Sequence, residues 1–502
     1  MGSIAEARSK EEVTPNVWVV PLAFLSHVRC CIQFVKLLAS HNLPVTFFCS
    51  KWDEKSLGLL ATLESWKGEG LDIRLRYLEI EEPNFSAGPD DHEEWKLLYQ
   101  RQEAWIDSIL KHESAIAQSR PTCVISDLWM PGVHESAVKY SVPAWVFSSL
   151  SLCCTGSAAY ISQLQDKGIL KLPHSPLDPL CQEFISVPGL PLLRLCELDD
   201  VAVFSSHITS PLGNRNGRIA YKSEVLILSS FEELEPRAFL EYSKYLVHNS
   251  AGEHKGEKRK IYMVGPTFPL TTSPAAEPTP NEERHPCLKF LDGQADSSVL
   301  FVAFGSTWQV APEQMQEIAI GLEGSEQPFL CVLQVAKTAQ YPTGDVFDII
   351  SPDCISRTKG RGLFVQGWMP QLLILGHPAV GGFLSHCGQN SLLEGLSMGV
   401  PLLTWPIFND QMLNARFAVD EIQAGLEITR DPRGERSVDR KEVETKVRAL
   451  FQSEEGKQAR NNTKRIRELA LQTVSQNGTS YKNIYALVTR IRDLAAEKQA
   501  GT

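Results

Sequence analysis

Residues 368–411 bring together side chains that could bind a charged ligand. Histidine, asparagine, serine, glutamate and aspartate lie there among short apolar runs, a mixture that is unusual for a protein core. Residues 383–385 are typical of a strand, and the polar turn after them leads into a predicted helix that closes at Gly399. A helix that starts at a strand end offers free backbone N–H groups and a positive dipole, which together form a cradle for phosphate. Asn390 and Ser391 could add further hydrogen bonds.

Two features of this stretch also have a purely structural explanation. Ser391 and Glu394 have the spacing of a capping box, in which side chains only satisfy the start of a helix. Asp410 and Gln411 follow a predicted strand at 402–405 and could bracket sugar hydroxyls as acceptor and donor, but such a pair is also common where a helix begins. Each feature taken alone favours the structural explanation.

Short apolar runs alternate with helical patterns along the whole chain. Strands are predicted in the first half at residues 17–20, 45–48 and 121–126, and in the second half at 299–304, 329–333, 363–365, 383–385 and 402–405. The last part of the chain is charged and helical, with a final amphipathic helix at 481–496. Such alternation predicts an α/β fold with parallel sheets that are covered by helices on both faces.

A chain of 502 residues is too long for a single hydrophobic core, so we expect two domains. We predict the first domain at residues 1–255, the second at 256–475 and a final helical segment at 476–502. A linker or exposed loop is predicted at 271–286, which is rich in Pro, Thr, Ser and Glu. Open parallel sheets bind ligands beyond the carboxyl ends of their strands, so two facing domains would enclose a cleft.

The charge balance and the apolar runs narrow the class of protein. Lys and Arg number 49 against 60 Asp and Glu, so a net charge of -11 gives nucleic acid no basic surface to bind. The longest early apolar run, 17–25, is far shorter than the ~20 residues of a membrane span, and the charged N-terminus is unlike a secretory signal. The 12 cysteines form no Cys-x-x-Cys pair, which argues against a disulfide framework and a zinc site. We therefore expect a cytoplasmic protein without nucleic acid partners or integral membrane contact.

Taken together, residues 368–411 resemble the signature box of the plant-type family of UDP-sugar-dependent glycosyltransferases that act on small molecules, the secondary-product glycosyltransferases. The positions that match the family's spacing are Trp368, Pro370, Gln371, Ile374, Leu375, His377, Gly381, Phe383, His386, Cys387, Gly388, Asn390, Ser391, Glu394, Gly399, Val400, Pro401, Trp405, Pro406, Asp410 and Gln411. So many coincident positions make the resemblance specific. It implies the GT-B architecture, in which two facing Rossmann-like domains form a cleft and the final helix packs back on the first domain. It also implies a monomer.

The resemblance implies a site for a UDP-sugar donor, formed by Ser306, Trp368, Gln371, His386, Gly388, Gln389, Asn390, Ser391, Glu394, Asp410 and Gln411. Within this set three residues would hold the nucleoside. Trp368 would stack on uracil, Gln371 would form a hydrogen bond nearby, and Glu394 would accept hydrogen bonds from the ribose hydroxyls.

The remaining donor residues would hold the diphosphate and the sugar. The diphosphate would be bound by residues at two strand ends: Ser306, His386, Asn390 and Ser391. Asp410 and Gln411 would bind the sugar, and the resemblance implies that Gln411 favours glucose. Gln389 departs from the family, which usually has Trp at this position beside the sugar and has Arg in some users of glucuronate. Because an amide has no charge to pair with a carboxylate, glucuronate gains no support.

Transfer to a hydroxyl also needs a base, because the acceptor loses a proton as it attacks the anomeric carbon. His27 follows the first strand in a loop similar to the family's Pro-x-Pro-x-x-Gly-His sequence, from which Ala23 and Ser26 depart. Asp127 ends the strand predicted at 121–126 and would fix the tautomer of the imidazole and stabilise the imidazolium. A lone histidine or aspartate at a strand end is more often a cap or a surface residue, but the signature box favours His27 and Asp127 as the catalytic pair.

The acceptor is expected in the first domain. Its pocket is predicted from residues that follow strands on the cleft side: Phe24, Trp129, Met130, Phe147 and Ser148. Each of them could equally belong to the core. Flavonoid, phenolic, hormone and terpenoid acceptors all fit the sequence, and attack through nitrogen, sulfur or carbon stays open.

The sequence predicts an inverting transfer with a UDP-sugar as co-substrate, no further cofactor and no bound metal. No Asp-x-Asp pair, of the kind that commonly holds the metal in other sugar transferases, occurs in the chain. The helix start and His386 could stabilise the departing diphosphate instead. A degenerate UDP-sugar-binding regulatory protein is one alternative, against which the presence of both His27 and Asp127 argues. A nucleotide-binding oxidoreductase is another, but no Gly-x-Gly-x-x-Gly follows a strand.

Overall fold

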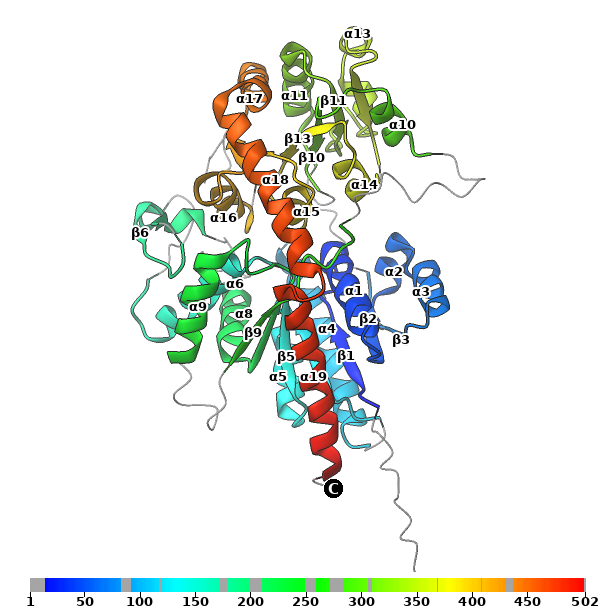
Figure 1. The fold of residues 1–502 in the computed structure, drawn as a ribbon, viewed down its shortest axis with the longest axis vertical. Coiled ribbons are helices and arrows are strands. Elements are labelled where there is room, and N and C mark those ends of the chain that lie inside the picture. The colour runs from blue at the N-terminus through cyan, green and yellow to red at the C-terminus, as the bar shows by residue number, and fades with distance from the viewer. Residues whose placement is uncertain are drawn as a thin grey trace, which may run out of the picture.

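The computed structural model describes residues 14–82, 92–116, 119–171, 178–190, 192–198, 210–248, 259–270, 284–305, 309–367, 369–407, 409–428 and 437–500. Two lobes face each other within this part of the chain, and each lobe is built on its own parallel sheet (Figure 1). The predicted pair of parallel α/β sheets is therefore confirmed.

The first sheet has seven parallel strands in the order β3-β2-β1-β4-β5-β8-β9. Their bounds are β1 Val17–Val20, β2 Val45–Cys49, β3 Ile73–Tyr77, β4 Cys123–Asp127, β5 Ala144–Ser148, β8 Val225–Leu228 and β9 Lys260–Met263. β1 and β4 pair in the middle of the sheet although about a hundred residues separate them, and the strand order reverses between them. Side chains that follow β1 and β4 therefore meet at the point where such sheets bind ligands.

The second sheet repeats this plan with six parallel strands in the order β12-β11-β10-β13-β14-β15. Their bounds are β10 Val299–Ala303, β11 Phe329–Val332, β12 Gly362–Val365, β13 Val380–Ser385, β14 Leu402–Thr404 and β15 Gly425–Glu427. The order reverses between β10 and β13, so the turns after these two strands also lie side by side. A short antiparallel pair, β6 Phe184–Ile185 and β7 Leu193–Arg194, lies outside both sheets.

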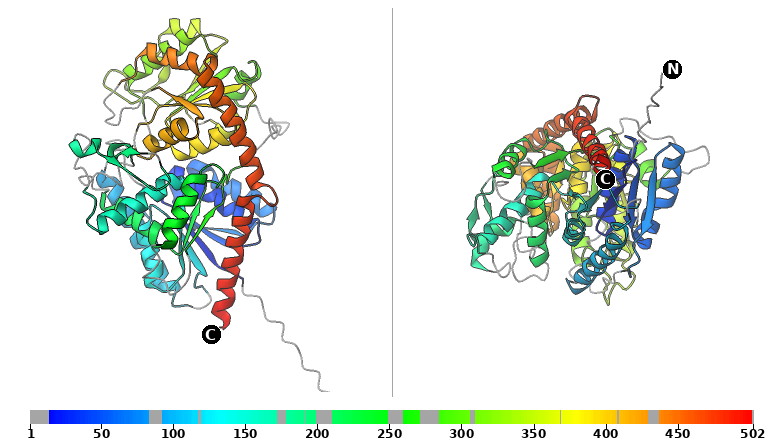
Figure 2. Two further views of the ribbon diagram at one scale, coloured as in Figure 1. Left: turned by 60° about the vertical axis from the view of Figure 1, so that its left-hand side comes forward. Right: turned by 90° about the horizontal axis from the view of Figure 1, so that it is seen from below.

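Helices connect successive strands and pack against the sheets (Figure 2). In the first lobe they are α1 Leu25–Ala39, α2 Lys51–Leu57, α3 Leu59–Gly68, α4 His92–Glu113, α5 Pro131–Lys139, α6 Leu152–Asp166, α8 Ser210–Lys222 and α9 Pro236–His248, with short turns at Pro179–Gln182 and Leu195–Glu197. In the second lobe they are α10 Pro286–Asp292, α11 Pro312–Ser325, α12 Val346–Ile349, α13 Pro352–Arg357, α14 Gln371–Leu375, α15 Gln389–Ser397, α16 Gln411–Arg416, a turn at Phe417–Glu421 and α17 Arg440–Gln452.

Two long helices, α18 Glu454–Val474 and α19 Thr479–Ala500, run in succession from the second lobe to the first (Figure 1). α18 packs on α15 and β15, whereas α19 packs on β9 and α1. The apolar side chains of Ile484, Leu487 and Ile491 recur at helical spacing and are buried in the core of the first lobe. Asn483 donates hydrogen bonds to Glu232 at 2.8 Å and to the carbonyl oxygen of Met263 at 3.0 Å. The final amphipathic helix expected at 481–496 is therefore present as α19.

The predicted limit between the domains at residue 255 lies outside the described residues, as do residues 271–283 of the predicted linker. The domain limits therefore stay predictions. All twelve cysteines are buried free thiols. Among the described residues no helix is long and apolar enough to cross a membrane, and no group of three or more His, Cys, Asp and Glu could hold a metal ion.

His134, on α5, is a titratable group buried in the first lobe away from the cleft. It is 7% exposed, and its Nδ1 atom has no hydrogen-bond partner among the described residues. Burial lowers the pKa of His134 from 6.5 to about 4. Between these two values the unfolded chain binds more protons than the folded chain, so this contribution to stability is present above pH 6.5 and is lost as the pH falls towards 4.

We expect the free energy of unfolding to fall less steeply with acid in a His134→Gln variant than in the wild type. Integrated over the shift, the difference between pH 7 and pH 5 is about 2 kcal/mol. Urea unfolding at the two pH values measures it. His112→Gln, on the exposed side of α4, serves as the control and should leave the pH dependence unchanged. Equal acid sensitivity of the His134 variant and the wild type would show that His134 is not the group that titrates.

Candidate functional site

A cavity of about 920 Å³ lies between the two lobes, at the carboxyl ends of both sheets. The segments after β1 and β4 line it from the first lobe, and the turns after β10 and β13 line it from the second lobe. Ligand pockets of drug-sized molecules commonly enclose about 300–1,000 Å³, and this cavity lies at the upper end of that range.

Most of the residues predicted from the sequence meet in this one cavity. It is lined by Phe24, His27, Trp129, Gln371, His386, Gly388, Gln389, Asn390, Ser391, Glu394, Asp410 and Gln411. Ser306 and Trp368 lie outside the described residues, but their chain neighbours Gly305, Gly367 and Met369 line the cavity.

His27 and Asp127 form a hydrogen-bonded pair at the centre of the first sheet. His27 lies in the first turn of α1, and its Nδ1 atom is 2.8 Å from Oδ2 of Asp127. The other carboxylate oxygen, Oδ1, accepts the backbone N–H of Trp129 at 2.9 Å. Because a carboxylate can only accept, Nδ1 of His27 carries the proton and Nε2 is left to take one up. The pair has the geometry of a base that is oriented by a buried acid.

The turn that presents His27 is held from α4 by Gln102, a fully buried residue. The side-chain oxygen of Gln102 accepts the backbone N–H of Ala23 at 3.0 Å, and its amide nitrogen donates to the carbonyl oxygen of Pro21 at 2.6 Å. These bonds pair a backbone N–H group and a backbone carbonyl group that follow the end of β1. No sequence pattern singles out Gln102, because its partners lie about 80 residues away in the chain.

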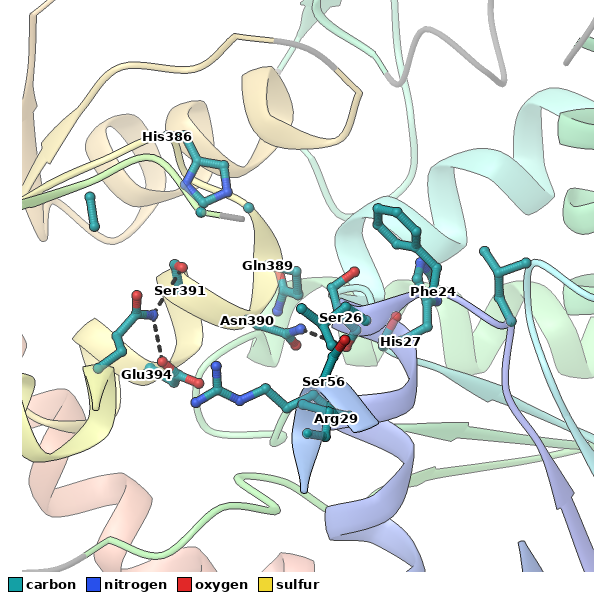
Figure 3. Close-up of a pocket in the computed structure, with 18 of the residues that line it drawn as sticks. Phe24, Ser26, His27, Arg29, Ser56, His386, Gln389, Asn390, Ser391 and Glu394 are labelled. Carbon is teal, nitrogen blue, oxygen red and sulfur yellow. Dashed lines mark hydrogen bonds between the residues drawn. The ribbon is translucent and has the colours of Figure 1, made fainter. Parts of the chain in front are cut away.

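On the second lobe, α15 begins at Gln389 and follows Gly388, so Ser391 is the third residue of the helix and does not cap it. The capping-box explanation of Ser391 and Glu394 is therefore wrong. Instead, the side-chain amide of Gln371 donates to the Ser391 hydroxyl at 3.1 Å and to Oε2 of Glu394 at 2.6 Å (Figure 3). The helix start stays open to the cavity, with its backbone N–H groups available to an anion.

Glu394 is a buried carboxyl group on the wall of the cavity. Burial raises the pKa of Glu394, and the charge of Arg29 and the hydrogen bond from Gln371 oppose that rise. A carboxyl group in this setting gains most from ligand groups that donate hydrogen bonds to it, such as hydroxyls.

His386, after β13, lies between two glycines. A Cβ atom would lie 2.8 Å from Nε2 of His386 if added at Gly305, and 2.5 Å from the same atom if added at Gly388. Only residues without a side chain leave room for the ring there. Burial lowers the pKa of His386 to about 4, so the ring is neutral near pH 7. His386 therefore offers an uncharged imidazole, and not a positive charge, to the turn after β10.

Asp410 is held by Asn414, one helical turn further along α16. The side-chain amide of Asn414 donates to Oδ2 of Asp410 at 2.6 Å and to the carbonyl oxygen of Cys387 at 2.9 Å. Gln411 accepts the backbone N–H of Ile407 at 2.9 Å. Asn414 was not predicted from the sequence, although its i, i+4 spacing from Asp410 is a signal for such a contact.

Aromatic side chains surround His27 on the first-lobe side of the cavity. Phe24 and Trp129 line it as predicted, and their rings lie 6.3 and 6.1 Å from the His27 ring. Trp95 and Tyr99 of α4 also line it, and Trp95 meets Phe24 edge to face at 4.9 Å. The sequence did not reveal Trp95 and Tyr99, because aromatic residues at helical spacing occur equally often in a core.

Three residues predicted for the acceptor pocket lie elsewhere. Met130 and Phe147 are fully buried in the core, where the Phe147 ring stacks on Phe34 at 4.7 Å. The Ser148 hydroxyl is hydrogen-bonded to the hydroxyl of Thr155 at 2.7 Å. Helices cover both faces of the sheet at β5, so its side chains pack internally, and the cavity is lined instead by the next residues, 149 and 150.

Comparison with known proteins agrees with this geometry. Residues 273–458 match the model of a family described as UDP-glucoronosyl and UDP-glucosyl transferase. UDP-glycosyltransferase 73C7 of Arabidopsis thaliana is 31% identical, over 77% of this chain and 78% of its own length. Scopoletin glucosyltransferase of Nicotiana tabacum is 29% identical, over 96% and 98%. The structure of Phytolacca americana UGT2 complexed with UDP-2fluoro-glucose and pterostilbene is 25% identical and superposes with a TM-score of 0.76, over 95% of this chain and 99% of that chain. The expected GT-B architecture is confirmed.

Proposed function

This chain belongs to the plant family of UDP-sugar-dependent glycosyltransferases that act on small molecules, and we propose that it transfers glucose from UDP-glucose to a hydroxyl of a small lipophilic acceptor. The transfer inverts the anomeric carbon and needs no metal. One observation carries the proposal: His27, which is hydrogen-bonded to the buried Asp127, lines the same cavity as the open start of α15. Base and donor site thus belong to different lobes, and the substrates meet between them.

In the proposed complex, the donor lies along α15. Trp368 stacks on uracil, with Gln371 beside it. Glu394 accepts hydrogen bonds from the ribose hydroxyls. The raised pKa of this buried carboxyl group supports that role, because such hydrogen bonds stabilise its charged form. The diphosphate is received at the start of α15 and the turn after β10, by Ser306, His386, Asn390 and Ser391. Gly388 lets the phosphate approach the backbone, and the sugar is bound by Gln389, Asp410 and Gln411.

The proposed chemistry is one displacement. Nε2 of His27 takes the proton of the acceptor hydroxyl while the oxygen attacks the anomeric carbon from the side opposite to the diphosphate. The new bond to the acceptor oxygen forms as the bond to the phosphate oxygen breaks, so an α-linked donor gives a β-linked product and UDP. Asp127 stabilises the imidazolium that results. The N–H groups at the start of α15 stabilise the charge that develops on the diphosphate.

The first-lobe wall supports a flat, apolar acceptor. Phe24, Trp95 and Trp129 surround His27. Aromatic side chains pack well against flat rings, so a phenolic or flavonoid acceptor suits the site better than a plain hydrocarbon alcohol. We further propose that the enzyme acts as a monomer in the cytoplasm.

A mass-spectrometric screen tests the proposal. Purified protein is incubated with EDTA and with UDP-glucose, UDP-galactose, UDP-xylose or UDP-glucuronate against a panel of phenols, flavonoids and terpenoid alcohols. We expect a product heavier by one hexose with UDP-glucose, and proton NMR of that product should show a β-linkage. No product with any donor, together with measurable UDP binding, would instead support the degenerate binding protein.

Gln389 is the donor-site residue that departs from the family, and we propose that it contributes to sugar choice. It is 6% exposed, and its side-chain oxygen has no hydrogen-bond partner among the described residues. Gln389 lines the cavity, and rotation of its side chain would bring this oxygen to a sugar hydroxyl of the right configuration. We therefore expect Gln389→Trp to weaken the preference for UDP-glucose over UDP-galactose by about fivefold, the equivalent of one neutral hydrogen bond.

The ratio of kcat/KM values for the two donors measures this preference. Affinity for UDP, which lacks the sugar, serves as the control and should stay within about twofold of the wild type. An unchanged ratio would show that position 389 does not set the preference.

A further inference from the structure

Arg29 is a charged residue of the cavity that no sequence pattern pointed to. It lies on α1 two residues after His27 and is partly buried. Among the described residues that line the cavity, it is the only lysine or arginine. The same lining contains two carboxylate side chains, those of Glu394 and Asp410.

The side chain of Arg29 leaves the first lobe and extends across the cavity towards Glu394 on α15 (Figure 3). It is close enough for its charge to lower the pKa of Glu394. Within the described part of the chain, however, no hydrogen bond or ion pair engages the guanidinium. Its five N–H groups are therefore available to a ligand that lies between the lobes.

A diphosphate in this cavity would need positive charge that the described lining of the second lobe does not supply. A nucleoside diphosphate sugar carries two negative charges on its phosphates, and UDP carries more when it leaves. His386 is neutral near pH 7, because burial lowers its pKa to about 4. The start of α15 contributes only about half a positive charge from the helix dipole. Glu394 and Asp410 add negative charge to the same wall.

We propose that Arg29 binds the diphosphate of the donor from the first lobe, opposite the start of α15. This inference rests on the proposed function. A planar guanidinium can bind two phosphate oxygens at once, and arginine keeps its charge throughout the physiological pH range. The donor would then be held by both lobes, and the residue that holds it from the first lobe would also neutralise UDP as it departs.

UDP and uridine differ only in the diphosphate. Their affinities for an Arg29→Met variant therefore separate a role in binding the diphosphate from a role in binding the nucleoside. Charge-assisted hydrogen bonds contribute enough that we expect UDP affinity to fall by about 10- to 100-fold, while uridine affinity changes by no more than about twofold. Arg29→Lys should recover part of the loss. In turnover with UDP-glucose, Arg29→Met should raise KM and also lower kcat, because the charge on the leaving group grows in the transition state.

Lys36→Met is the matched control. Lys36 lies on the same helix, and its ammonium group is 3.7 Å from Glu69 and 4.7 Å from the centre of the Trp66 ring, outside the cavity lining. The control removes the same charge and should leave both affinities unchanged. Retained uridine affinity shows that the Arg29 variant is folded.

Isothermal titration calorimetry on the full chain distinguishes the outcomes. An equal loss of UDP and uridine affinity would overturn the inference, because Arg29 would then act on the ribose or on Glu394. Unchanged UDP affinity in Arg29→Met would overturn it as well, while leaving the proposed function in place. A wild-type protein that binds neither UDP nor uridine and transfers no sugar would overturn the proposed function and this inference with it.

Discussion

Replacing His27 by alanine is expected to lower kcat by about a thousandfold, since general base catalysis contributes about 10²- to 10⁴-fold. His27 lines the cavity, and its Nδ1 atom is hydrogen-bonded to the buried carboxylate of Asp127 at 2.8 Å. Donor binding should stay nearly intact, because His27 is not among the residues proposed to bind UDP, which are Arg29 of the first lobe and residues of the second lobe. Product formation measured by mass spectrometry gives kcat, and calorimetry gives the dissociation constant of UDP.

His41→Ala is the control for this variant. His41 follows the end of α1, and its Nδ1 atom is hydrogen-bonded to the carbonyl oxygen of Leu37 far from the cavity. Both variants should show the thermal unfolding of the wild type, although His27→Ala leaves the Asp127 carboxylate without its imidazole partner. Unchanged turnover in His27→Ala would remove His27 as the base.

Several interior strands could be predicted from the sequence, although no predicted range covers β5 or β8. Among the edge strands, β12 was expected, whereas β3 and β9 were missed. β1 and β10 are continuous apolar runs and were expected. β3 reads Ile-Arg-Leu-Arg-Tyr and β9 reads Lys-Ile-Tyr-Met, and both lie at edges of the first sheet, where charged side chains reach solvent. The patterns of β3 and β9 are therefore too polar to resemble the buried strands of the same sheet.

Some residues of the candidate site could be predicted from a local sequence motif, and others could not. Gly388, Gln389 and Glu394 are close in sequence and lie on one strand-turn-helix unit, so a local motif predicts that they act together. Arg29 and Gln102 contact the site only because α1 and α4 pack where they do, and no local pattern encodes that packing. Phe147 was misjudged for a related reason, because a run such as Ala144–Ser148 that is buried on both faces does not reveal which side faces the cleft.

Asp127→Asn is expected to lower kcat by about 10²- to 10⁴-fold, the contribution of general base catalysis, because it holds the histidine base in the wrong tautomer. In the wild type, Oδ1 of Asp127 accepts the backbone N–H of Trp129 at 2.9 Å and Oδ2 faces Nδ1 of His27. In the variant, the side-chain oxygen must stay on the Trp129 N–H, because an amide turned the other way would leave that buried donor unpaired. The amide NH₂ then faces Nδ1 of His27. Nδ1 has to accept, so the proton moves to Nε2, which can no longer take one from the acceptor.

Asp107→Asn is the matched control, because Asp107 is also hydrogen-bonded in the first lobe, to Ser136, Lys139 and Tyr140, but does not line the cavity. It makes the same change of atoms and charge and should keep kcat within about twofold of the wild type. The double variant His27→Ala, Asp127→Asn should be no slower than His27→Ala alone, because Asp127 acts only through the imidazole. An additive loss in the double variant would mean that Asp127 contacts the reacting groups directly. Near-wild-type turnover in Asp127→Asn would mean that the tautomer of His27 is set by something other than this carboxylate.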